Sequence, residues 1–515
     1  MIFDSRYPPV AIRDITITER VFEGLFLDLD APVIVEGPTG RKVTAGELLD
    51  RIKRFAGGLI KHGYGGKTVA IMSTNHPDYP VVFHGTAWSG GTISTANPTY
   101  TASELNYQLK DSGAELLVTL PDFLDTAKEA AKGTNVKEII TFGSAEGTTD
   151  IDDFLGDPLA EQIPVDLDEH VVVLPYSSGT TGLPKGVMLT HRNIATNVDQ
   201  SIGGIDIQQG EWTVAFLPFF HIYGQTLLMN VYLAQGAGII TMPRFELESF
   251  LKLVQEYKTP RIWAVPPVAI ALSKHPLVDE YDLSAVEYVF SAAAPADEAL
   301  MNAIRDRIGA KGVQAYGMTE LSPISHMAPA ENASSGAVGV AVPNTECRIV
   351  DPETGKDCGE AEEGELWIRG PQVMKGYLNN PQATAATITD DGWLRTGDLA
   401  AIDANGELWI RDRLKELIKF KGFQVAPAEV EAVLLTCPGV GDCAVLAAQD
   451  EEAGEVPVAY VVQAPGADIT ADDILASIEG RLVSYKVPRA ITFIDAIPKT
   501  ASGKILRREL KKMMA

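Results

Sequence analysis

The sequence predicts an α/β protein made of a large layered α/β N-terminal domain and a small mobile α+β C-terminal domain. Short apolar runs alternate with amphipathic helical patterns over about residues 30–410, which favours helices packed on a largely parallel sheet. Beyond this region the pattern changes to short strands and helices over roughly 100 residues, too few for the main core but enough for a mobile lid.

Runs of apolar and β-branched residues mark the strands of the large domain. Residues 69–72, 115–119 and 171–174 are expected to be buried strands, and the helical patterns between them include residues 45–62 and 103–112. This alternation is typical of a parallel sheet with helical crossovers.

A predicted hairpin closes the large domain. Residues 399–402 and 407–410 are apolar runs, and Asn405-Gly406 between them is a strong turn signal. We therefore place the N-terminal domain at residues 1–411 and the C-terminal domain at residues 412–515.

The composition limits the classes of protein to which this chain can belong. The chain of 515 residues is 45% hydrophobic and 22% charged, which is typical of a folded globular enzyme of two or three domains. Its net charge of −26 disfavours a nucleic acid or an anionic membrane as a partner. We find no apolar run that could span a membrane and no apolar signal core at residues 1–10. The C-terminal residues are not a peroxisomal address.

The four cysteines form no CxxC pair, so neither a zinc site nor a disulfide framework is expected. These features favour a cytoplasmic protein.

The most informative motif is residues 176–186, YSSGTTGLPKG, directly after the strand expected at 171–174. Small residues let backbone N–H groups approach phosphate oxygens, hydroxyls add donors, and Lys185 supplies positive charge. It is not a Walker A loop, because Pro184 stands where that motif has glycine. A flexible turn is the alternative, but the full string is far more specific than that.

With four further motifs, the chain resembles the adenylate-forming superfamily of acyl-CoA synthetases, luciferases and adenylation domains, and within it the 4-coumarate:CoA ligases. The motifs are residues 314–320 (QAYGMTE), 392–398 (GWLRTGD), 412–419 (DRLKELIK) and 498–504 (PKTASGK). The resemblance runs from about residue 30 to Leu510. It implies a ligase that uses ATP to form an acyl-adenylate and passes the acyl group to coenzyme A.

The resemblance implies a set of residues for ATP. Glu320, helped by Thr181, would hold Mg²⁺, which neutralises phosphate charge. Asp398 would accept hydrogen bonds from the ribose hydroxyls, and Arg413 would contact ribose or phosphate. Without their context, Asp398 would be a turn residue and Arg413 a surface arginine. The implied ATP ligands are Ser177, Ser178, Gly179, Thr180, Thr181, Lys185, Gln314, Ala315, Tyr316, Gly317, Met318, Thr319, Asp398, Arg413 and Lys415.

The family's two half-reactions imply a further set. Lys504 would bridge the carboxylate and the α-phosphate, although it could also belong to a basic tail with Arg507 and Arg508. A swing of the small domain about a hinge near Lys415 would then replace Lys504. It would bring in Lys419 and Gln424 for adenylate handling, with Arg244, Lys421 and Gly422 for coenzyme A. His221 would sit at the mouth of the acyl pocket and gate the thiol, or be structural.

The implied acyl pocket is aromatic and uncharged. Its residues are Tyr223, Thr226, Trp263, Phe290, Ala292, Ala293, Ala315, Gly317, Pro323 and Ile324. Plant coumarate ligases typically carry lysine at the place of Phe290, glycine at the places of Ala292 and Ala315, and a smaller residue at the place of Trp263. These departures favour a compact apolar acid, of the cinnamate or benzoate type or a short-to-medium fatty acid.

Three alternatives stay open at this point. The enzyme could load a separate carrier protein, could act as a luciferase-like oxygenase, or could be a nucleotide-binding regulator without turnover. Lys185, Glu320, Asp398 and Lys504 are all present, which favours the enzyme readings. The partners expected are ATP, coenzyme A and a small acid, with the chain a monomer or a homodimer. Acetylation of Lys504 would remove its charge and disable adenylation.

Overall fold

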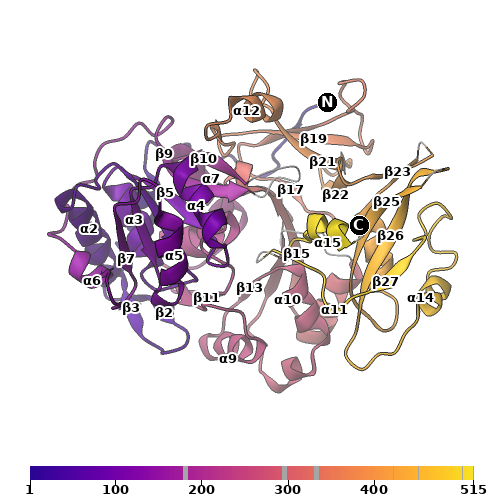
Figure 1. Ribbon diagram of the computed structural model, residues 1–515, viewed down its shortest axis with the longest axis horizontal. Helices are drawn as coiled ribbons and strands as arrows, with labels where there is room; N and C mark the ends of the chain where they lie inside the picture. Colours follow the sequence, from indigo (N-terminus) through magenta and orange to yellow (C-terminus); the bar gives the residue numbers. More distant parts are fainter. Residues whose placement is uncertain are drawn as a thin grey trace.

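A computed structural model describes residues 1–177, 184–292, 298–329, 336–421, 423–450, 452–500 and 503–513. The chain forms a large α/β body and a smaller body built from its C-terminal end (Figure 1). The predicted fold class is confirmed.

The largest sheet has eight strands in the order β20-β10-β9-β5-β4-β6-β7-β8. Its strands from β9 to β8 are parallel, and β10 and β20 complete it in antiparallel fashion. The bounds are β4 Thr68–Met72, β5 Thr92–Ala96, β6 Leu116–Thr119, β7 Glu138–Thr141, β8 Thr149–Asp150, β9 Val171–Ser177, β10 Lys185–Thr190 and β20 Gly376–Tyr377.

The expected strands and helices of this layer are present with small changes at their ends. The helices at 45–62 and 103–112 are α2, Ala45–Lys61, and α4, Ala102–Ser112. Each begins at a threonine whose hydroxyl accepts from the N–H of a glutamate three residues on, while that carboxylate accepts from the threonine N–H. This capping box satisfies donors that a helix start leaves free, which explains why prediction located these ends well.

Two further sheets complete the mixed α/β layers. One has the order β11-β12-β2-β3, and the other β13-β14-β15-β16-β17. Their bounds are β2 Pro32–Glu36, β3 Lys42–Thr44, β11 Trp212–Ala215, β12 Gly238–Thr241, β13 Arg261–Ala264, β14 Tyr288–Ser291, β15 Lys311–Gly317, β16 Ile324–Met327 and β17 Val340–Ala341.

The other helices of the large body cover and connect these sheets (Figure 1). Their bounds are α1 Ile17–Leu25, α3 Tyr79–Trp88, η1 Pro121–Phe123, α5 Leu124–Ala131, α6 Ile151–Phe154, α7 His191–Gly204, the π-helix η2 Gly224–Val231, α8 Tyr232–Ala234, α9 Leu247–Tyr257, α10 Pro266–Lys274, η3 Pro276–Glu280, α11 Glu298–Ile308, η4 Thr319–Leu321 and α12 Pro381–Thr387.

An antiparallel sheet of order β1-β18-β19-β21-β22 leads to the smaller body. Its strands are β1 Phe3–Asp4, β18 Glu346–Val350, β19 Gly364–Arg369, β21 Leu394–Ile402 and β22 Leu408–Arg413. The predicted hairpin is β21–β22, and β22 continues past residue 411 to Arg413, opposite Asp398.

The smaller body has its own sheet and core. The sheet has the order β24-β23-β26-β25, with β27 beside β26. Ile418, Val425, Val430, Val445 and Val461 are among the buried residues of its core. The bounds are β23 Ile418–Phe420, β24 Phe423–Val425, α13 Pro427–Leu435, β25 Val440–Asp450, β26 Gly454–Gln463, α14 Ala471–Ser477, β27 Ile491–Phe493 and α15 Arg507–Met513.

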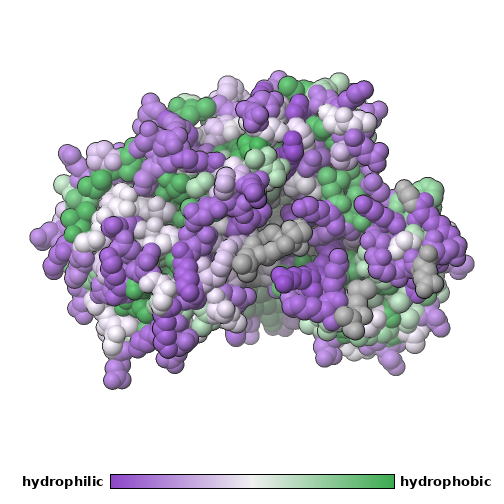
Figure 2. Space-filling view, turned by 45° about the horizontal axis from the view of Figure 1, so that its top comes forward, coloured by the Kyte–Doolittle hydropathy of each residue, from purple (hydrophilic) through white to green (hydrophobic). Residues whose placement is uncertain are grey.

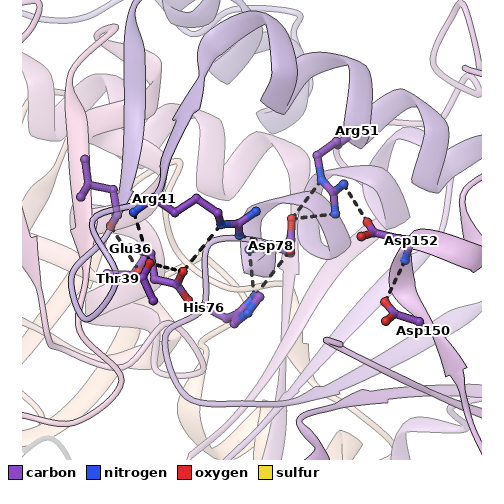
Figure 3. Close-up of polar contacts among 10 residues, drawn as sticks. Glu36, Thr39, Arg41, Arg51, His76, Asp78, Asp150 and Asp152 are labelled. Atoms are coloured by element: carbon purple, nitrogen blue, oxygen red, sulfur yellow. Dashed lines mark hydrogen bonds and ion pairs between the residues drawn. The ribbon is translucent and has the colours of Figure 1, made fainter. Parts of the chain in front are cut away.

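A charged cluster joins the loop after β4 to three neighbouring elements (Figure 3). Asp78 is 2.9 Å from Arg51 of α2 and 3.8 Å from Arg41 of the β2–β3 hairpin, and the N–H of Asp78 donates to His76. Arg51 also lies 2.8 Å from Asp152 of α6. Because its charges are paired with one another, we interpret this cluster as a brace of the large body.

The four cysteines are buried and free. No helix among the described residues combines the length and the apolar composition that a bilayer crossing needs.

Candidate active site

The two ends of the predicted phosphate loop lie side by side. Ser177 ends β9 and Lys185 begins β10, and the two residues are register partners. Lys185 Nζ lies 4.0 Å from the ring centroid of Tyr377, a cation–π contact that fixes this charge. The loop between them, which includes Ser178, Gly179, Thr180 and Thr181, is outside the described residues.

Glu320 faces these loop ends from η4. It is 5% exposed, and its Oε1 accepts from Ser177 Oγ at 3.2 Å and from the Tyr377 hydroxyl at 2.8 Å. The Glu320 carboxylate raises the pKa of Tyr377, after burial itself. A carboxylate with two hydroxyl donors is thereby held beside Lys185.

The donor set around Glu320 fits Mg²⁺ bound together with nucleotide. Mg²⁺ prefers oxygen ligands and commonly uses one or two protein carboxylates plus substrate phosphates. Within the described ranges no group of three or more His, Cys, Asp or Glu side chains is placed to hold a metal, so a site made of protein side chains alone is not present there. Both hydrogen bonds go to Oε1 of Glu320, and among the described residues none is donated to Oε2, so Oε2 is the oxygen that could meet the ion.

Asp398 is the second buried carboxylate. On β21 it is 4% exposed, with Tyr316 donating to Oδ2 at 2.5 Å and Arg413 Nε lying 3.2 Å from Oδ1. Burial raises the pKa of Asp398, while the Arg413 charge and the Tyr316 hydrogen bond act in the opposite direction. β21–β22 pairing places Arg413 opposite Asp398, so the strand register itself builds this pair.

The motif at residues 314–320 forms the end of β15 and η4. Gly317 admits no side chain, because a Cβ there would lie 2.2 Å from the Pro323 carbonyl oxygen. The N–H of Met318 donates to that same carbonyl at 3.0 Å. The remaining members of this predicted set are Gln314, Ala315, Tyr316 and Thr319, and all of them lie on β15 or η4.

Lys504 reaches this site from the far end of the chain. Hydrogen bonds from its N–H to Thr500 Oγ1 (3.0 Å) and from the Thr500 N–H to its carbonyl (2.8 Å) form the turn that carries it. Burial and the Arg413 charge lower the pKa of Lys504 to about 8, although Glu416, Asp398 and Glu320 raise it. Lys504 is therefore near both buried carboxylates, Asp398 and Glu320.

His221 lies at the same meeting point. Its Nδ1 accepts from the N–H of Tyr223 at 3.2 Å, which assigns the ring proton to Nε2. Burial, and then the charge of Lys504, lower the pKa of His221 to about 4. The imidazole is therefore neutral at physiological pH and can accept or donate a hydrogen bond without carrying charge.

The predicted acyl-pocket residues gather around an aromatic stack. Trp263 of β13 and Phe290 of β14 are register partners, and their rings stack at 4.4 Å with an angle of 17°. The Tyr223 ring meets Trp263 edge-on at 6.5 Å. Thr226 of η2 donates to the Ser322 carbonyl at 2.9 Å, which joins the pocket to η4.

The other members of this set are Ala292, Ala315, Gly317, Pro323 and Ile324, at the ends of β14, β15 and β16. Ala293 lies outside the described residues. Every predicted pocket residue that the structure describes is uncharged.

The residues expected for the second half-reaction lie elsewhere. Lys419 and Gln424 are exposed register partners on the β23–β24 hairpin, and Lys421 pairs with Glu452 at 2.5 Å. Figure 1 shows β23 at the outer end of the smaller body, away from β9 and β10. Arg244, predicted for coenzyme A, is exposed in the loop after β12. Lys415, predicted as the hinge and as an ATP contact, is exposed in the turn after β22. Gly422 is outside the described part of the chain.

Sequence reasoning missed residues that act through distant contacts. Tyr377 is 57 positions from Glu320, and Asn75 binds a loop about 140 positions later. No local pattern signals such pairs. The sequence allows Arg507 to belong to an exposed basic tail. In the structure its guanidinium is largely buried between Glu416 and Glu431.

A recess opens between the large and the small bodies and is flanked by hydrophilic residues (Figure 2). A recess between two bodies is a common place for a substrate site. The arrangement around Glu320, Asp398 and Lys504 can bind a nucleotide, neutralise phosphate charge and hold an acid nearby.

Comparison with known proteins gives the family. A model of AMP-binding enzymes matches residues 28–378, and a model of the AMP-binding enzyme C-terminal domain matches residues 429–504. A 4-coumarate–CoA ligase from Vanilla planifolia is 42% identical, and 4-coumarate–CoA ligase 2 from Nicotiana tabacum is 41% identical. Each alignment covers 100% of this chain, with 96% and 97% of the relatives.

Solved structures agree on the fold. ATP-bound MatB from Rhodopseudomonas palustris superposes with a TM-score of 0.87 at 30% identity, over 97% of this chain and 99% of that one. The anthranilate CoA ligase AuaEII, in complex with anthranoyl-AMP, gives a TM-score of 0.91 at 24% identity, over 98% and 99%. At that identity AuaEII supports the fold alone.

Proposed function

This chain belongs to the family of AMP-binding enzymes, and we propose that it converts an aryl carboxylic acid into its acyl-adenylate with ATP and then into its coenzyme A thioester. It is an AMP-forming acid–CoA ligase with ATP and coenzyme A as co-substrates. The finer parts of the proposal are the acid, the metal and the roles of individual residues.

The observation that carries the proposal is the convergence of Lys185, Glu320, Asp398, Arg413 and Lys504, which come from separate motifs. A carboxylate attacks the α-phosphorus of ATP poorly, because both carry negative charge. Lys185, Arg413 and Lys504 surround the two buried carboxylates. These cations can neutralise the phosphate charge and align the acid with the α-phosphorus. Asp398 would accept from the vicinal ribose hydroxyls, which present two donors.

Glu320 would hold Mg²⁺ at its free carboxylate oxygen, with Thr181 as a second protein ligand. The ion supplies charge neutralisation of the phosphates when it is bound. Lys504 would bridge the acid and the α-phosphate, and its ammonium loses little solvation on doing so because it is already largely buried.

The second half-reaction supports a division into a main domain and a lid. Lys419, Gln424 and Lys421 lie together on an exposed hairpin, and Lys504 occupies the site in their place. We propose domains at 1–411 and 412–515 with a hinge near Lys415, about which the hairpin replaces Lys504. Arg244, Lys421 and Gly422 would then contact coenzyme A, with His221 at the entrance for the thiol.

The stacked Trp263 and Phe290 support an aryl acid. Two flat rings at 4.4 Å form a wall that a planar aromatic acid can pack against, and no described pocket residue is charged. The relatives that are 4-coumarate–CoA ligases agree with an acid of this class. The large size of Trp263 favours a compact acid over a long chain.

Coenzyme A thioester formation tests the proposal directly. Purified protein with ATP, Mg²⁺ and coenzyme A is given a pooled panel of benzoates, cinnamates and fatty acids, and products are read by mass spectrometry. One or a few dominant aryl thioesters are expected. Adenylate without thioester would point to another acceptor, such as a carrier protein, and a fatty acyl product would overturn the aryl assignment.

A further inference from the structure

Arg507, three residues after Lys504, lies between two acidic side chains. Nη1 is 2.9 Å from Glu416, Nη2 is 2.5 Å from Glu431, and Nε donates to the carbonyl of Val445 at 3.3 Å. The side chains of Arg507, Glu416 and Glu431 are only 17%, 16% and 12% exposed. Each guanidinium nitrogen of Arg507 therefore has an ion-pair or hydrogen-bond partner. The next residue, Arg508, is exposed.

Glu416 pairs with Arg507 and also acts electrostatically on two residues of the candidate active site. It follows the proposed hinge residue, and its N–H donates to the Arg413 carbonyl at 2.9 Å. Its carboxylate raises the pKa of Lys504 and also that of Arg413. One largely buried carboxylate thus acts on three cations, Lys504, Arg413 and Arg507, and the ion pair forms with Arg507.

Glu431 connects this ion pair to the core of the small body. It lies on α13, and its Oε1 accepts from Arg507 and from the N–H of Val445 on β25 at 2.8 Å. Arg507 therefore ties the segment that carries Lys504 to α13 and β25 on one side, and to the turn after β22 on the other.

We propose that Arg507 is a positioning residue for adenylation, which neutralises Glu416 and anchors the Lys504 turn so that the Lys504 ammonium stays free for the acid and the α-phosphate. Without the guanidinium, Glu416 is left unpaired in a largely buried place, where its charge can draw on Lys504, a cation whose pKa it already raises. The inference rests on the proposed function, because Lys504 serves the adenylation step in it.

The two half-reactions separate this role from a general loss of stability. Adenylation is measured as ATP–pyrophosphate exchange with the best acid of the panel, and thioester formation with synthetic 4-coumaroyl-AMP and coenzyme A. Arg507→Met is expected to lower the kcat of exchange about 10- to 100-fold, the scale of a misplaced catalytic group. Thioester formation should stay within about threefold of the wild type.

A second substitution tests the competition for Lys504. Adding Glu416→Gln to Arg507→Met removes the rival carboxylate, so exchange should recover several-fold over the single variant. Arg508→Met is the matched control and should leave both half-reactions unchanged. If Arg507→Met does not fold, as judged by circular dichroism, Arg507→Lys carries the same test, since lysine cannot bridge both carboxylates.

Equal losses in both half-reactions, or no recovery on adding Glu416→Gln, would overturn the role of Arg507. A wild-type protein without exchange or thioester activity would instead overturn the proposed function itself. The two failures are therefore distinguishable.

Discussion

The ammonium of Lys504 is held partly out of water, and this has a consequence for pH dependence. Its pKa is lowered to about 8 by burial and by Arg413, so the charged form is lost as pH rises through that value. In the proposed mechanism, adenylation needs the charged form. The kcat/KM for ATP, which reports groups of the free enzyme, should therefore be level below the pKa and fall above it.

Pyrophosphate exchange from pH 6 to pH 10 checks this expectation. Bound ATP adds negative charge near Lys504, so the fall in kcat should lie at higher pH than the fall in kcat/KM. Lys504→Ala should lose at least ~100-fold at all pH values, the scale of one key electrostatic donor. If the activity of Lys504→Ala still falls at the same pH as that of the wild type, the group that titrates is not Lys504.

For single residues, the motifs and the resemblance indicate which charged side chains to expect in the site, but not which neighbours hold them. Glu320, Asp398 and Lys504 were predicted as site residues, whereas the hydroxyl of Tyr377 on Glu320 and the Arg507–Glu416 pair were not. Both of these contacts join parts of the chain that only tertiary folding brings together.

Among the elements, the parallel strands β13 and β14 form a wall of the proposed acyl pocket. The indole N–H of Trp263 donates to the Tyr232 hydroxyl at 3.0 Å, which locks the ring that stacks on Phe290. Trp263→Phe removes this lock and shortens the wall. The ratio of kcat/KM for cinnamates to that for benzoates should rise about tenfold, the scale of one or two added carbon atoms in a pocket.

The control for this variant is Trp212→Phe on β11, which makes the same chemical change away from the pocket. It should leave the ratio unchanged. If Trp263→Phe slows all acids of the panel equally, the wall does not select for length.

One buried side chain, Asn75, makes three hydrogen bonds to the segment before His221. Asn75 donates to the carbonyls of Ala215 and Leu217 at 2.8 and 2.9 Å and accepts from the N–H of Phe219 at 2.8 Å. Asn75→Ala leaves three buried backbone groups without this partner. We expect a loss of about 2–4 kcal/mol in the free energy of unfolding and a higher KM for the acid.

Denaturant unfolding and steady-state kinetics measure the two effects, with the exposed Asn405→Ala as control. If the expected loss of stability is measured but KM is unchanged, Asn75 contributes to folding and not to acid binding.

The Asn75 contact also shows which features of the elements cannot be predicted. Periodicity and capping boxes locate α2 and α4, but the bridge from the loop after β4 to the loop before η2 has no signature in sequence.

For the whole molecule, the roles proposed for Lys504 and for the β23–β24 hairpin require two conformations. Lys504 lies beside Asp398 and Glu320, while Lys419 and Gln424 are exposed on the β23–β24 hairpin of the same body. The turn from Leu414 to Glu416 connects the two bodies, and it is held by the N–H groups of Leu414 and Glu416, which donate to Gly397 and Arg413. A rotation within this turn would exchange the two sets.

Lys415→Pro tests whether that rotation is needed. Proline fixes φ near −65° and removes an N–H, and no described hydrogen bond uses the N–H of Lys415. With the present conformation favoured, pyrophosphate exchange should stay within about tenfold of the wild type, while thioester formation from 4-coumaroyl-AMP should fall about 100-fold or more.

Lys415→Ala removes the same side chain but leaves the backbone free, so it corrects for any contact of Lys415 with ATP. If proline and alanine slow thioester formation to the same extent, the small body does not turn about this residue, and the coenzyme A thiol must reach the adenylate with Lys504 still in place.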